Sequence, residues 1–301
     1  MQKQGLTTLA LQKFKKSFWG VLSFWFILFL AFISVFAYVL APDDSQFANQ
    51  MHLSIHSKQP GFSVDMLVIP STLKTDQHFF NRLFFGATNP PSEIPIVSYE
   101  LSTNQIKYTE YASEGLQGLE KTLAIPSNEE SSVLPFVVQK TFYFGTDKYG
   151  RDLLSRILVG ARISFSIGFV AVFISLFIGI LLGSIAGYFG GKWDKLIMWV
   201  INVTWSIPTL LLVIAITLAL GKGFWQVFIA VGLTMWVEVA RIVRGQVMGV
   251  KEMQYVTAAR ALGYTDFRII LKHILPNILA PVIVISAANF AAAILIESGL
   301  S

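Results

Sequence analysis

Two glycine-lysine dipeptides are the first residues in the chain that could do chemistry, since phosphate-binding loops use such a pair to hold nucleotide phosphates. That loop reads GxxxxGK followed by Ser or Thr, which ligates magnesium. Gly191-Lys192 has Ala186 at the leading position and Trp193 at the last, and Gly221-Lys222 also fails at both. HExxH and GxSxG are absent as well. The sequence therefore predicts that this chain is not an enzyme and that any ATP hydrolysis is done by a partner.

Glu238 is the one acid inside a long apolar run, and ionisable groups in such places are functional candidates. Arg241 follows three residues later, so we expect a local ion pair between these two side chains. A role for Glu238 in binding substrate or protons is the alternative.

Three histidines, His52, His56 and His78, are candidate metal ligands, and the first two are spaced i, i+4. A fourth ligand is not evident, so we expect solvated loop histidines and no metal site. Cysteine is absent from the sequence. That absence excludes a disulfide framework, a thiolate zinc site and a thiol nucleophile.

The composition indicates a membrane protein. Hydrophobic residues make up 54% of the 301 residues, and charged residues 14%. Several apolar runs are long enough to cross about 30 Å of hydrocarbon as helices. They cover residues 18–41, 163–188, 196–220, 224–243 and 278–300. A cleaved signal peptide is the alternative for the first run, which is longer than the roughly 7 to 15 apolar residues of such peptides. Pro208 is expected to kink the third run after Ile207.

The distribution of charge predicts the orientation of the spans. The connector 241–273 has more Lys and Arg than acidic residues, so the positive-inside rule places it in the cytoplasm. Residues 1–17 are then cytoplasmic, and the acidic segment 42–158 is extracytoplasmic. Residues 159–301 form a transmembrane domain with the cytoplasmic loop 244–276. Lipid headgroups and a cytoplasmic partner account for the basic residues, and nucleic acid is not an expected partner.

The segment outside the membrane is expected to be a folded insert. Short, often β-branched runs bounded by Pro or Asn favour strands. They lie at residues 62–69, 94–101 and 133–138. Residues 151–162 should form an interfacial helix leading into the second span, with Asp152 and Arg156 paired at i, i+4. This helix is either a structural elbow that sets the entry angle of the span or a gating or docking surface for an outside partner.

A polar block at residues 255–276 separates the last two apolar runs. Gly263 is placed to end one short helix in the left-handed conformation, and Thr265 or Asp266 to cap a second. Pro276 opens the last span at a position where no N–H is needed. Two short helices in water have little to stabilise them, so we expect the block to dock into a groove on a partner.

The spacing of seven residues in this block is informative. They are Thr257, Ala258, Ala259, Gly263, His273, Leu275 and Pro276. The pattern resembles the EAA loop of ABC importer permeases, the coupling helix that sits in a cleft of the ATPase subunit. Thr257 stands where that family has Glu, and His273 where it has an aliphatic residue. The resemblance implies coupling to an ATPase through residues 255–276, and these two departures are where coupling is expected to differ from the relatives.

A second motif precedes the second span and follows the pattern GTDxxGRDxxSR. Its residues are Gly145, Thr146, Asp147, Gly150, Arg151, Asp152, Ser155 and Arg156. The segment is similar to one in the C-type permease subunits of dipeptide, oligopeptide and nickel importers, where it also precedes span two. The similarity continues to the end of the chain, with Asn202 where many relatives carry Asp. The long insert resembles that of microcin and oligopeptide uptake permeases.

These resemblances imply an all-α polytopic membrane protein with the type I transmembrane fold of ABC importers and a mixed insert that can contain β-strands. They imply a peptide permease of the bacterial inner membrane, with no cofactor and no metal of its own. Expected partners are a homologous permease, two ATP-binding subunits, an extracytoplasmic solute-binding protein and the lipid bilayer. The family has six spans with both termini inside, so we expect this sequence to lack the last span.

Other functions stay open on the sequence alone. A nickel or other small-solute permease is disfavoured by the absence of Cys, and of His within a span. A secondary transporter driven by an ion gradient would need paired intramembrane acids or broken helices, and only Glu238 offers itself. A membrane-anchored sensor would bind its ligand with the insert. Co-purification with an ATP-binding subunit separates these functions.

Overall fold

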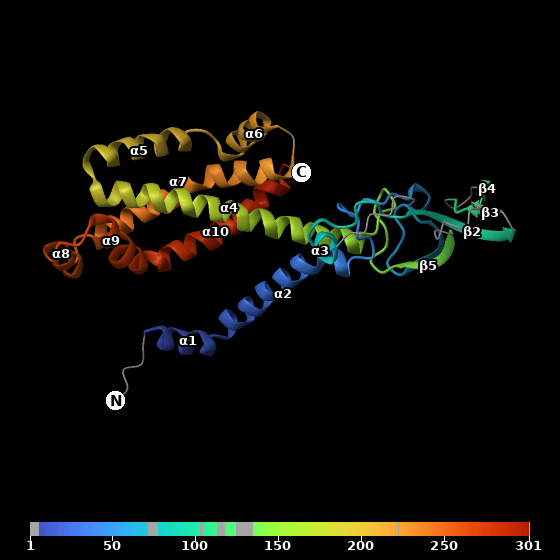
Figure 1. Cartoon of the computed structure of the whole chain (residues 1–301), viewed down its shortest axis with the longest axis horizontal. Helices are drawn as coiled ribbons and strands as arrows, with labels where there is room; N and C mark the ends of the chain where they lie inside the picture. Colours follow the sequence, from blue (N-terminus) through green and yellow to red (C-terminus); the bar gives the residue numbers. More distant parts are fainter. Residues whose placement is uncertain are drawn as a thin grey trace. The chain divides into compact units, whose positions relative to one another are not determined.

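The computed structural model describes residues 6–71, 78–102, 105–112, 118–124, 135–221 and 223–300. The chain divides into two compact units, Met1–Ile163 and Ser164–Ser301, and each is described by itself below. Figure 1 shows the helices and strands coloured along the sequence. Helix α4 (Leu153–Phe189) begins in the first unit and continues in the second.

The apolar helices confirm the predicted polytopic membrane protein. Within the described residues, four stretches are long and apolar enough to cross a membrane, and a bent pair of helices would make a fifth. The four are Phe18–Leu40, Leu153–Phe189, Trp225–Val250 and Asp266–Ser298, and the bent pair is Gly191–Trp205 with Thr209–Leu220. Each of them overlaps one of the five apolar runs in the sequence.

The first unit begins with helices α1 (Leu6–Lys16) and α2 (Phe18–Leu40). Ser17 separates them and caps α2, because the Gly20 N–H donates to Ser17 Oγ at 3.3 Å. A short helix, α3 (Phe79–Phe85), packs against α2 and exposes all four of its phenylalanines. Exposed aromatic side chains beside an apolar helix are typical of the membrane interface.

The insert is built on a five-stranded antiparallel sheet of order β4-β3-β2-β1-β5. The strands are β1 (Phe62–Ile69), β2 (Ser92–Ser102), β3 (Gln105–Glu110), β4 (Glu120–Ala124) and β5 (Phe136–Phe142), and a 3-10 turn, η1 (Leu53–Ile55), precedes them. The first two predicted strands coincide with β1 and with part of β2. Of the third predicted strand, 133–138, residues 133 and 134 lie outside the described residues and the rest overlaps β5. Strands β3 and β4 were not predicted.

Alternation along β1 gives this sheet apolar side chains on both faces, since successive residues of a strand point to opposite sides. Val64, Met66 and Val68 join Ile55 and Phe142 in one buried cluster. Leu67 joins a second cluster with three residues of the neighbouring strands, Ile96, Ile106 and Tyr108. The insert is therefore a folded domain with its own core, as the sequence predicts.

Helix α4 differs from its prediction at its start. It runs unbroken for 37 residues from Leu153, so the expected interfacial helix is its first turns and not a separate element. The expected pair of Asp152 and Arg156 is wrong. Asp152 Oδ2 accepts the Ser155 N–H at 2.8 Å, as an N-terminal cap does, and Arg156 lies 3.7 Å from Asp147 instead.

Arg162, on the third turn of α4, ties three segments of the first unit together. Its guanidinium donates to the carbonyls of Ser34 and Val35 on α2 and of Phe84 on α3, each at 2.9 Å, and lies 5.0 Å from the Tyr38 ring centroid. Charged hydrogen bonds of this kind contribute about 1.5 to 3 kcal/mol each when buried, and less where solvent reaches them.

We expect Arg162→Met to loosen α2 and α3 from α4, because the methionine keeps the apolar stem and removes every donor. Limited proteolysis in detergent should cut the 41–62 segment at least about tenfold faster than in the wild type. Lys107→Met, which removes an exposed cation of β3 that pairs with Glu120 and not with the 41–62 segment, is the control. Equal cleavage rates in the two variants would contradict this role.

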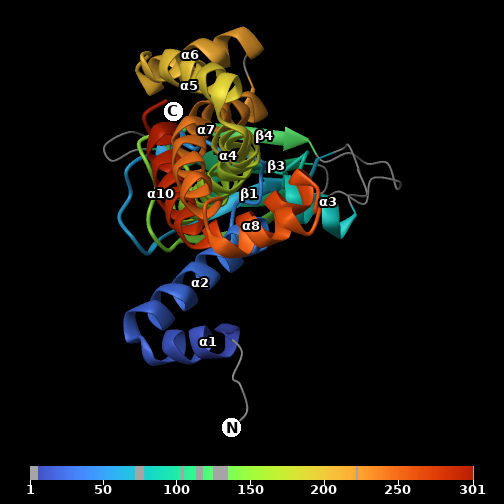
Figure 2. The ribbon, with the colours of Figure 1, turned by 90° about the vertical axis from the view of Figure 1, so that its left-hand side faces the viewer.

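The second unit is organised around α7. Its elements are the end of α4, α5 (Gly191–Trp205), α6 (Thr209–Leu220), α7 (Phe224–Val250), α8 (Gln254–Ala261), α9 (Asp266–Ile269), a π-helical turn η2 (Ile270–Ile274), a 3-10 turn η3 (Leu275–Ile278) and α10 (Leu279–Ser298). Each of the three buried clusters in the described part of this unit includes residues of α7. Helices α5 and α6 lie on one side of α7 (Figures 1 and 2).

The third apolar run is broken rather than kinked. Helix α5 ends at Trp205 and α6 begins at Thr209, and the two are bent by 92°. The Ser206 hydroxyl donates to the Asn202 carbonyl at 2.8 Å and so satisfies one carbonyl at the end of α5. The prediction of a bend at Pro208 is confirmed, but helix α5 ends earlier than Ile207 and the change of direction is larger than a proline kink.

Candidate functional site

Thr146 anchors the 145–156 motif to the loop before β1. Its hydroxyl accepts the Lys58 N–H at 2.9 Å and donates to the Ile55 carbonyl at 2.5 Å, and its own N–H donates to the Lys58 carbonyl at 3.1 Å. Thr146 is 7% exposed. The backbone N–H and carbonyl groups of Lys58 and the carbonyl of Ile55 are thus hydrogen-bonded to one buried threonine instead of to a strand or helix.

Asp147 accepts the hydrogen bonds that hold the next turn of the motif. Its carboxylate accepts the backbone N–H groups of Tyr149 and Arg151 at 2.8 and 3.0 Å, and the Arg151 guanidinium lies 2.6 Å away. Burial alone would raise the pKa of Asp147, but the hydrogen bonds from Arg151 and Tyr149 outweigh it and hold that pKa below its usual value. The Asp147 carboxylate is therefore charged at neutral pH.

Asp152 and Ser155 join the motif to the end of α2. The Ser155 hydroxyl donates to Asp152 Oδ2 and accepts the Asp43 N–H at 2.9 Å, and both side chains are buried. Asp43 in turn accepts the N–H groups of Ser45 and Gln50. Motif residues thus hold the segments 43–50 and 55–58, which are about a hundred residues away in the chain.

The histidines of the insert do not gather. Among the described residues, no group of three or more His, Asp and Glu side chains could hold a metal ion. The expectation of a solvated His52 is wrong: it is buried, 3.8 Å from a Glu93 carboxylate that Lys140 also contacts at 2.5 Å. Burial, helped by the charge of Lys140 and opposed by Asp43, lowers the pKa of His52 to about 4. His52 is therefore a neutral core histidine.

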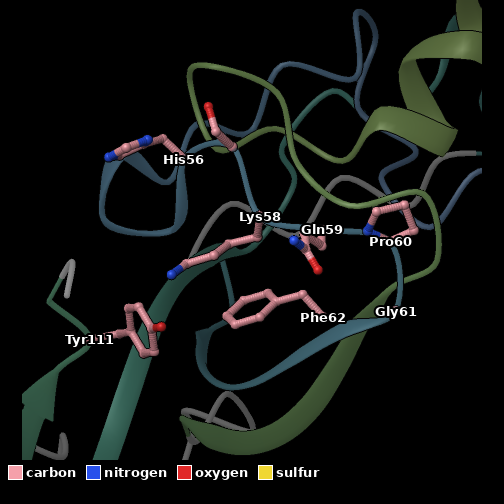
Figure 3. Close-up of a pocket in the computed structure, with 8 residues that line it drawn as sticks. His56, Lys58, Gln59, Pro60, Gly61, Phe62 and Tyr111 are labelled. Carbon is pink, nitrogen blue, oxygen red and sulfur yellow. The ribbon is translucent and has the colours of Figure 1, made fainter.

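A hollow of about 850 Å³ opens on the insert and was not predicted. It is lined by residues 56–62 and Tyr111 (Figure 3). The Lys58 ammonium lies 5.5 Å from the Phe62 ring centroid and 5.4 Å from that of Tyr111, a cation–π arrangement. Thr146 of the motif fixes the backbone of Lys58. Seven of the lining residues are consecutive, and only the fold brings Tyr111 to them, so no spacing pattern in the sequence indicates the hollow.

The 255–276 block has an inner and an outer side. On α8, Val256 and Ala259 are buried, whereas Thr257 and Ala258 are exposed. Ala259 therefore packs into the protein's own core and does not face outward with the other two small residues. Gly263 ends α8 at φ +78°, and the Tyr264 N–H donates to the Ala259 carbonyl at 3.2 Å. The left-handed Gly263 is confirmed.

The other motif residues of the block lie where α9 passes into α10. Thr265 is the N-cap of α9 but makes no side-chain capping bond. His273 stacks on the Tyr264 ring with centroids 5.7 Å apart, while the Arg268 guanidinium lies 4.5 Å from the same centroid. Leu275 is partly buried against the core around α7, and Pro276 is exposed.

Pro276 has a wider effect than the predicted helix start. A proline lacks an N–H and its ring crowds the carbonyl four residues earlier, so a regular α-helix cannot pass through it. The backbone therefore forms the π-helical turn Ile270–Ile274 and the 3-10 turn Leu275–Ile278 before α10 begins. The irregular stretch lies between the exposed α8–α9 pair and the apolar helix α10. Such interruptions mark hinges and functional sites in other helices.

Arg241 does not pair with Glu238 as expected. Its guanidinium donates to Asn202 Oδ1 at 3.2 Å and lies 3.7 Å from the Trp205 ring centroid, both on α5. Glu238 is exposed on the surface of the described chain. The Arg241 side chain is directed at α5, where Asn202 and Trp205 contact it, whereas the Glu238 side chain is exposed.

Comparisons with known proteins agree with these features. Residues 179–301 match the family described as binding-protein-dependent transport system inner membrane component, and residues 5–60 match the N-terminal TM domain of oligopeptide transport permease C. The oligopeptide transport system permease protein OppC of Bacillus subtilis (strain 168) is 42% identical over 162 residues, covering 54% of this chain and 53% of that protein. The dipeptide transport system permease protein DppC of the same organism is 43% identical over 159 residues, covering 53% and 50%.

Other matches have related descriptions. The glutathione transport system permease protein GsiD of Escherichia coli O6:K15:H31 (strain 536 / UPEC) is 42% identical over 159 residues, covering 53% of this chain and 52% of that protein. The chain spans about half the length of these curated relatives. An inward-facing structure of the MetNI methionine ABC transporter superposes with a TM-score of 0.38 at 20% identity, covering 46% of this chain and 68% of that one.

Proposed function

We propose that the chain belongs to the family of binding-protein-dependent transport inner-membrane components, whose model matches residues 179–301, and that it is a permease subunit of an ATP-driven peptide importer. It forms the translocation pathway with a homologous permease. Two ATP-binding subunits supply the energy, and a solute-binding protein outside the membrane delivers the peptide. The similar proteins are described as oligopeptide, dipeptide and glutathione permeases, which supports a peptide over nickel as the substrate.

The surface of the 255–276 block carries this proposal. Leu262 is 74% exposed and Phe267 is 73% exposed, and the small residues Thr257 and Ala258 of α8 are exposed as well. Large apolar side chains in a polar segment between membrane helices suit a protein partner, and a buried aromatic anchor is a common hot spot of binding. The ATP-binding subunit is the partner that this family implies at this position.

The proposed orientation follows from the same assignment. The block and residues 1–17 lie in the cytoplasm, and the sheet insert lies outside the membrane. The hydrogen bonds of Thr146, Asp152 and Ser155 support a structural role for the motif, since they fix the backbone of the insert or the start of α4. Docking of an outside partner on the insert is the remaining role for that surface.

Replacing Phe267 with alanine tests the coupling assignment. The side chain is exposed, so the fold should be unaffected, whereas a hot-spot aromatic costs about 2 kcal/mol or more when truncated. We expect affinity for the ATP-binding subunits to fall about 30-fold, measured by co-purification and by titration in nanodiscs. Phe80→Ala, which truncates an equally exposed phenylalanine of α3, is the control. Unchanged affinity in Phe267→Ala, or no complex with the wild type, would refute the proposal.

A further inference from the structure

Tyr188 lies at the last turn of α4 and reaches into the 255–276 block. Its hydroxyl donates to Asp266 Oδ1 at 2.6 Å, across 78 positions of sequence. A short hydrogen bond from a hydroxyl to a carboxylate is among the stronger polar contacts in proteins. Asp266 is the first residue of α9, so the bond joins the end of a membrane helix to the start of a helix in the block.

The same tyrosine also contacts α8. The Arg260 guanidinium lies 5.7 Å from the Tyr188 ring centroid, within the range of a cation–π contact. Arg260 is in the last turn of α8 and Asp266 opens α9, on the two sides of Gly263. Tyr188 therefore holds both short helices of the block through one side chain.

The ring of Tyr188 has a separate, apolar role. It is 8% exposed and belongs to the buried cluster that Val239, Val243 and Val247 of α7 share with Val256 and Ala259 of α8. Replacing tyrosine with phenylalanine keeps this ring and removes only the hydroxyl. The two roles can therefore be separated by one substitution.

The connection of the block to α10 contrasts with its connection to α4. Between α9 and α10 the backbone passes through a π-helical turn and a 3-10 turn, so the hydrogen-bond pattern changes from α to π, then to 3-10, and back to α. A movement of α8 and α9 can be absorbed at that irregular stretch. The connection to α4 has no such irregular stretch, because the Tyr188 hydroxyl bonds directly to Asp266 of α9.

We propose that the Tyr188 hydroxyl is a positioning group that transmits movement of the ATPase-docked block to helix α4. The inference rests on the proposed function, since it needs an ATP-binding subunit seated on α8 and α9. Binding of that subunit shifts the block, and the Tyr188–Asp266 bond makes α4 move with it. Without the bond, the block still binds the subunit, and its movement is lost at the irregular turns before α10.

Tyr188→Phe in the complete transporter tests this assignment. In proteoliposomes with both permeases, the ATP-binding subunits and the solute-binding protein, peptide taken up per ATP hydrolysed should fall about tenfold, as expected for loss of one charged hydrogen bond. Co-purification of the ATP-binding subunits should be unchanged. Asp266→Asn, which keeps an acceptor oxygen, should retain more coupling than Asp266→Ala, and the double variant Tyr188→Phe/Asp266→Ala should be no worse than Asp266→Ala.

Tyr143→Phe, which removes the hydroxyl of an exposed tyrosine in the insert, is the matched control and should transport like the wild type. Full coupling in Tyr188→Phe, or additive losses in the double variant, would overturn the role of the bond while leaving the proposed function intact. Failure of the wild-type chain to bind ATP-binding subunits would instead overturn the proposed function. Loss of those subunits in Tyr188→Phe alone would show a docking role and not a transmitting one, which also overturns the inference.

Discussion

A leucine at position 183 should prevent the second unit from assembling. Gly179, Gly183 and Gly187 recur every fourth residue on α4, so they form one stripe along that helix. A side chain at Gly183 would place its Cβ 2.5 Å from the Ala240 carbonyl oxygen and 2.9 Å from Val243 Cβ, both on α7. The stripe lets the two helix backbones approach closely, which is how small residues stabilise helix pairs in membranes.

The size of the effect follows from what would have to move. The atom in contact is a backbone oxygen, so no rotamer change can relieve the overlap. Even an added methyl in a packed core typically costs about 1 to 3 kcal/mol, and leucine adds three further carbons to the same gap. Helix α7 belongs to each buried cluster described in this unit, so its displacement would disrupt all of them.

We therefore expect Gly183→Ala to lower the thermal unfolding midpoint in detergent, and Gly183→Leu to give no monodisperse protein by size-exclusion chromatography. Gly160 provides the control on the same helix, because a Cβ built there meets no atom within 4 Å. Gly160→Ala should be neutral or slightly stabilising, since alanine favours helix over glycine. Similar behaviour of Gly160→Leu and Gly183→Leu would show that the stripe does not control the packing.

The membrane helices were predictable because hydropathy requires no knowledge of neighbours. Long apolar runs give the positions of α2, α4, α7 and α10 within a few residues at most ends. The contacts between them were not predictable. Arg241 has Glu238 one turn away in sequence, yet it bonds to Asn202 and Trp205 of α5, and only the packing of α5 on α7 brings these side chains together.

Strands β3 and β4 show a different limit. Their charged residues pair across the sheet, as in Lys107 with Glu120 at 2.9 Å and Lys121 with Glu110 at 2.7 Å. Such residues make the segments look like polar loops, because half of their side chains face solvent. The buried Ile106 and Tyr108 carry the alternation, but β3 is six residues long and gives a weak pattern.

The two motifs were found by spacing, but the contacts of their residues were only partly foreseen. Turn and cap chemistry is local, so Gly263 and the end of α8 could be placed from sequence. The partners of Thr146 and Ser155 lie about ninety to a hundred and ten residues away, in the segments 43–50 and 55–58. The local sequence pattern thus identifies Thr146 and Ser155 as candidate residues, but their hydrogen-bond partners are known only from the fold.

Gly150→Ala should open the loop that the 145–156 motif holds. Gly150 has φ +72°, a region that costs a non-glycine residue roughly 1 to 2 kcal/mol. A Cβ there would also collide with the carbonyl oxygen of His52. That carbonyl cannot retreat freely, because it accepts the Ile55 N–H at 3.0 Å while the His52 N–H donates to the Tyr149 carbonyl at 3.2 Å.

Gly61 separates the two causes. It has φ +84°, and a Cβ built there meets no atom within 4 Å. Gly61→Ala therefore carries only the cost of the left-handed conformation, whereas Gly150→Ala carries that cost and the backbone collision. We expect a loss of local stability of about 1 to 2 kcal/mol for Gly61→Ala and more than about 3 kcal/mol for Gly150→Ala.

Hydrogen exchange of the loop amides measures the difference. The N–H groups of Ser57 and Lys58 donate to Asp147 and Thr146 of the motif, so they are protected only while the loop is held. In Gly150→Ala their exchange should be faster than in the wild type by about 100-fold or more, against roughly 5- to 30-fold in Gly61→Ala. Equal acceleration in the two variants would mean that the close approach of Gly150 to His52 contributes nothing. Acceleration confined to Gly150→Ala would instead identify that approach as the main constraint on the loop.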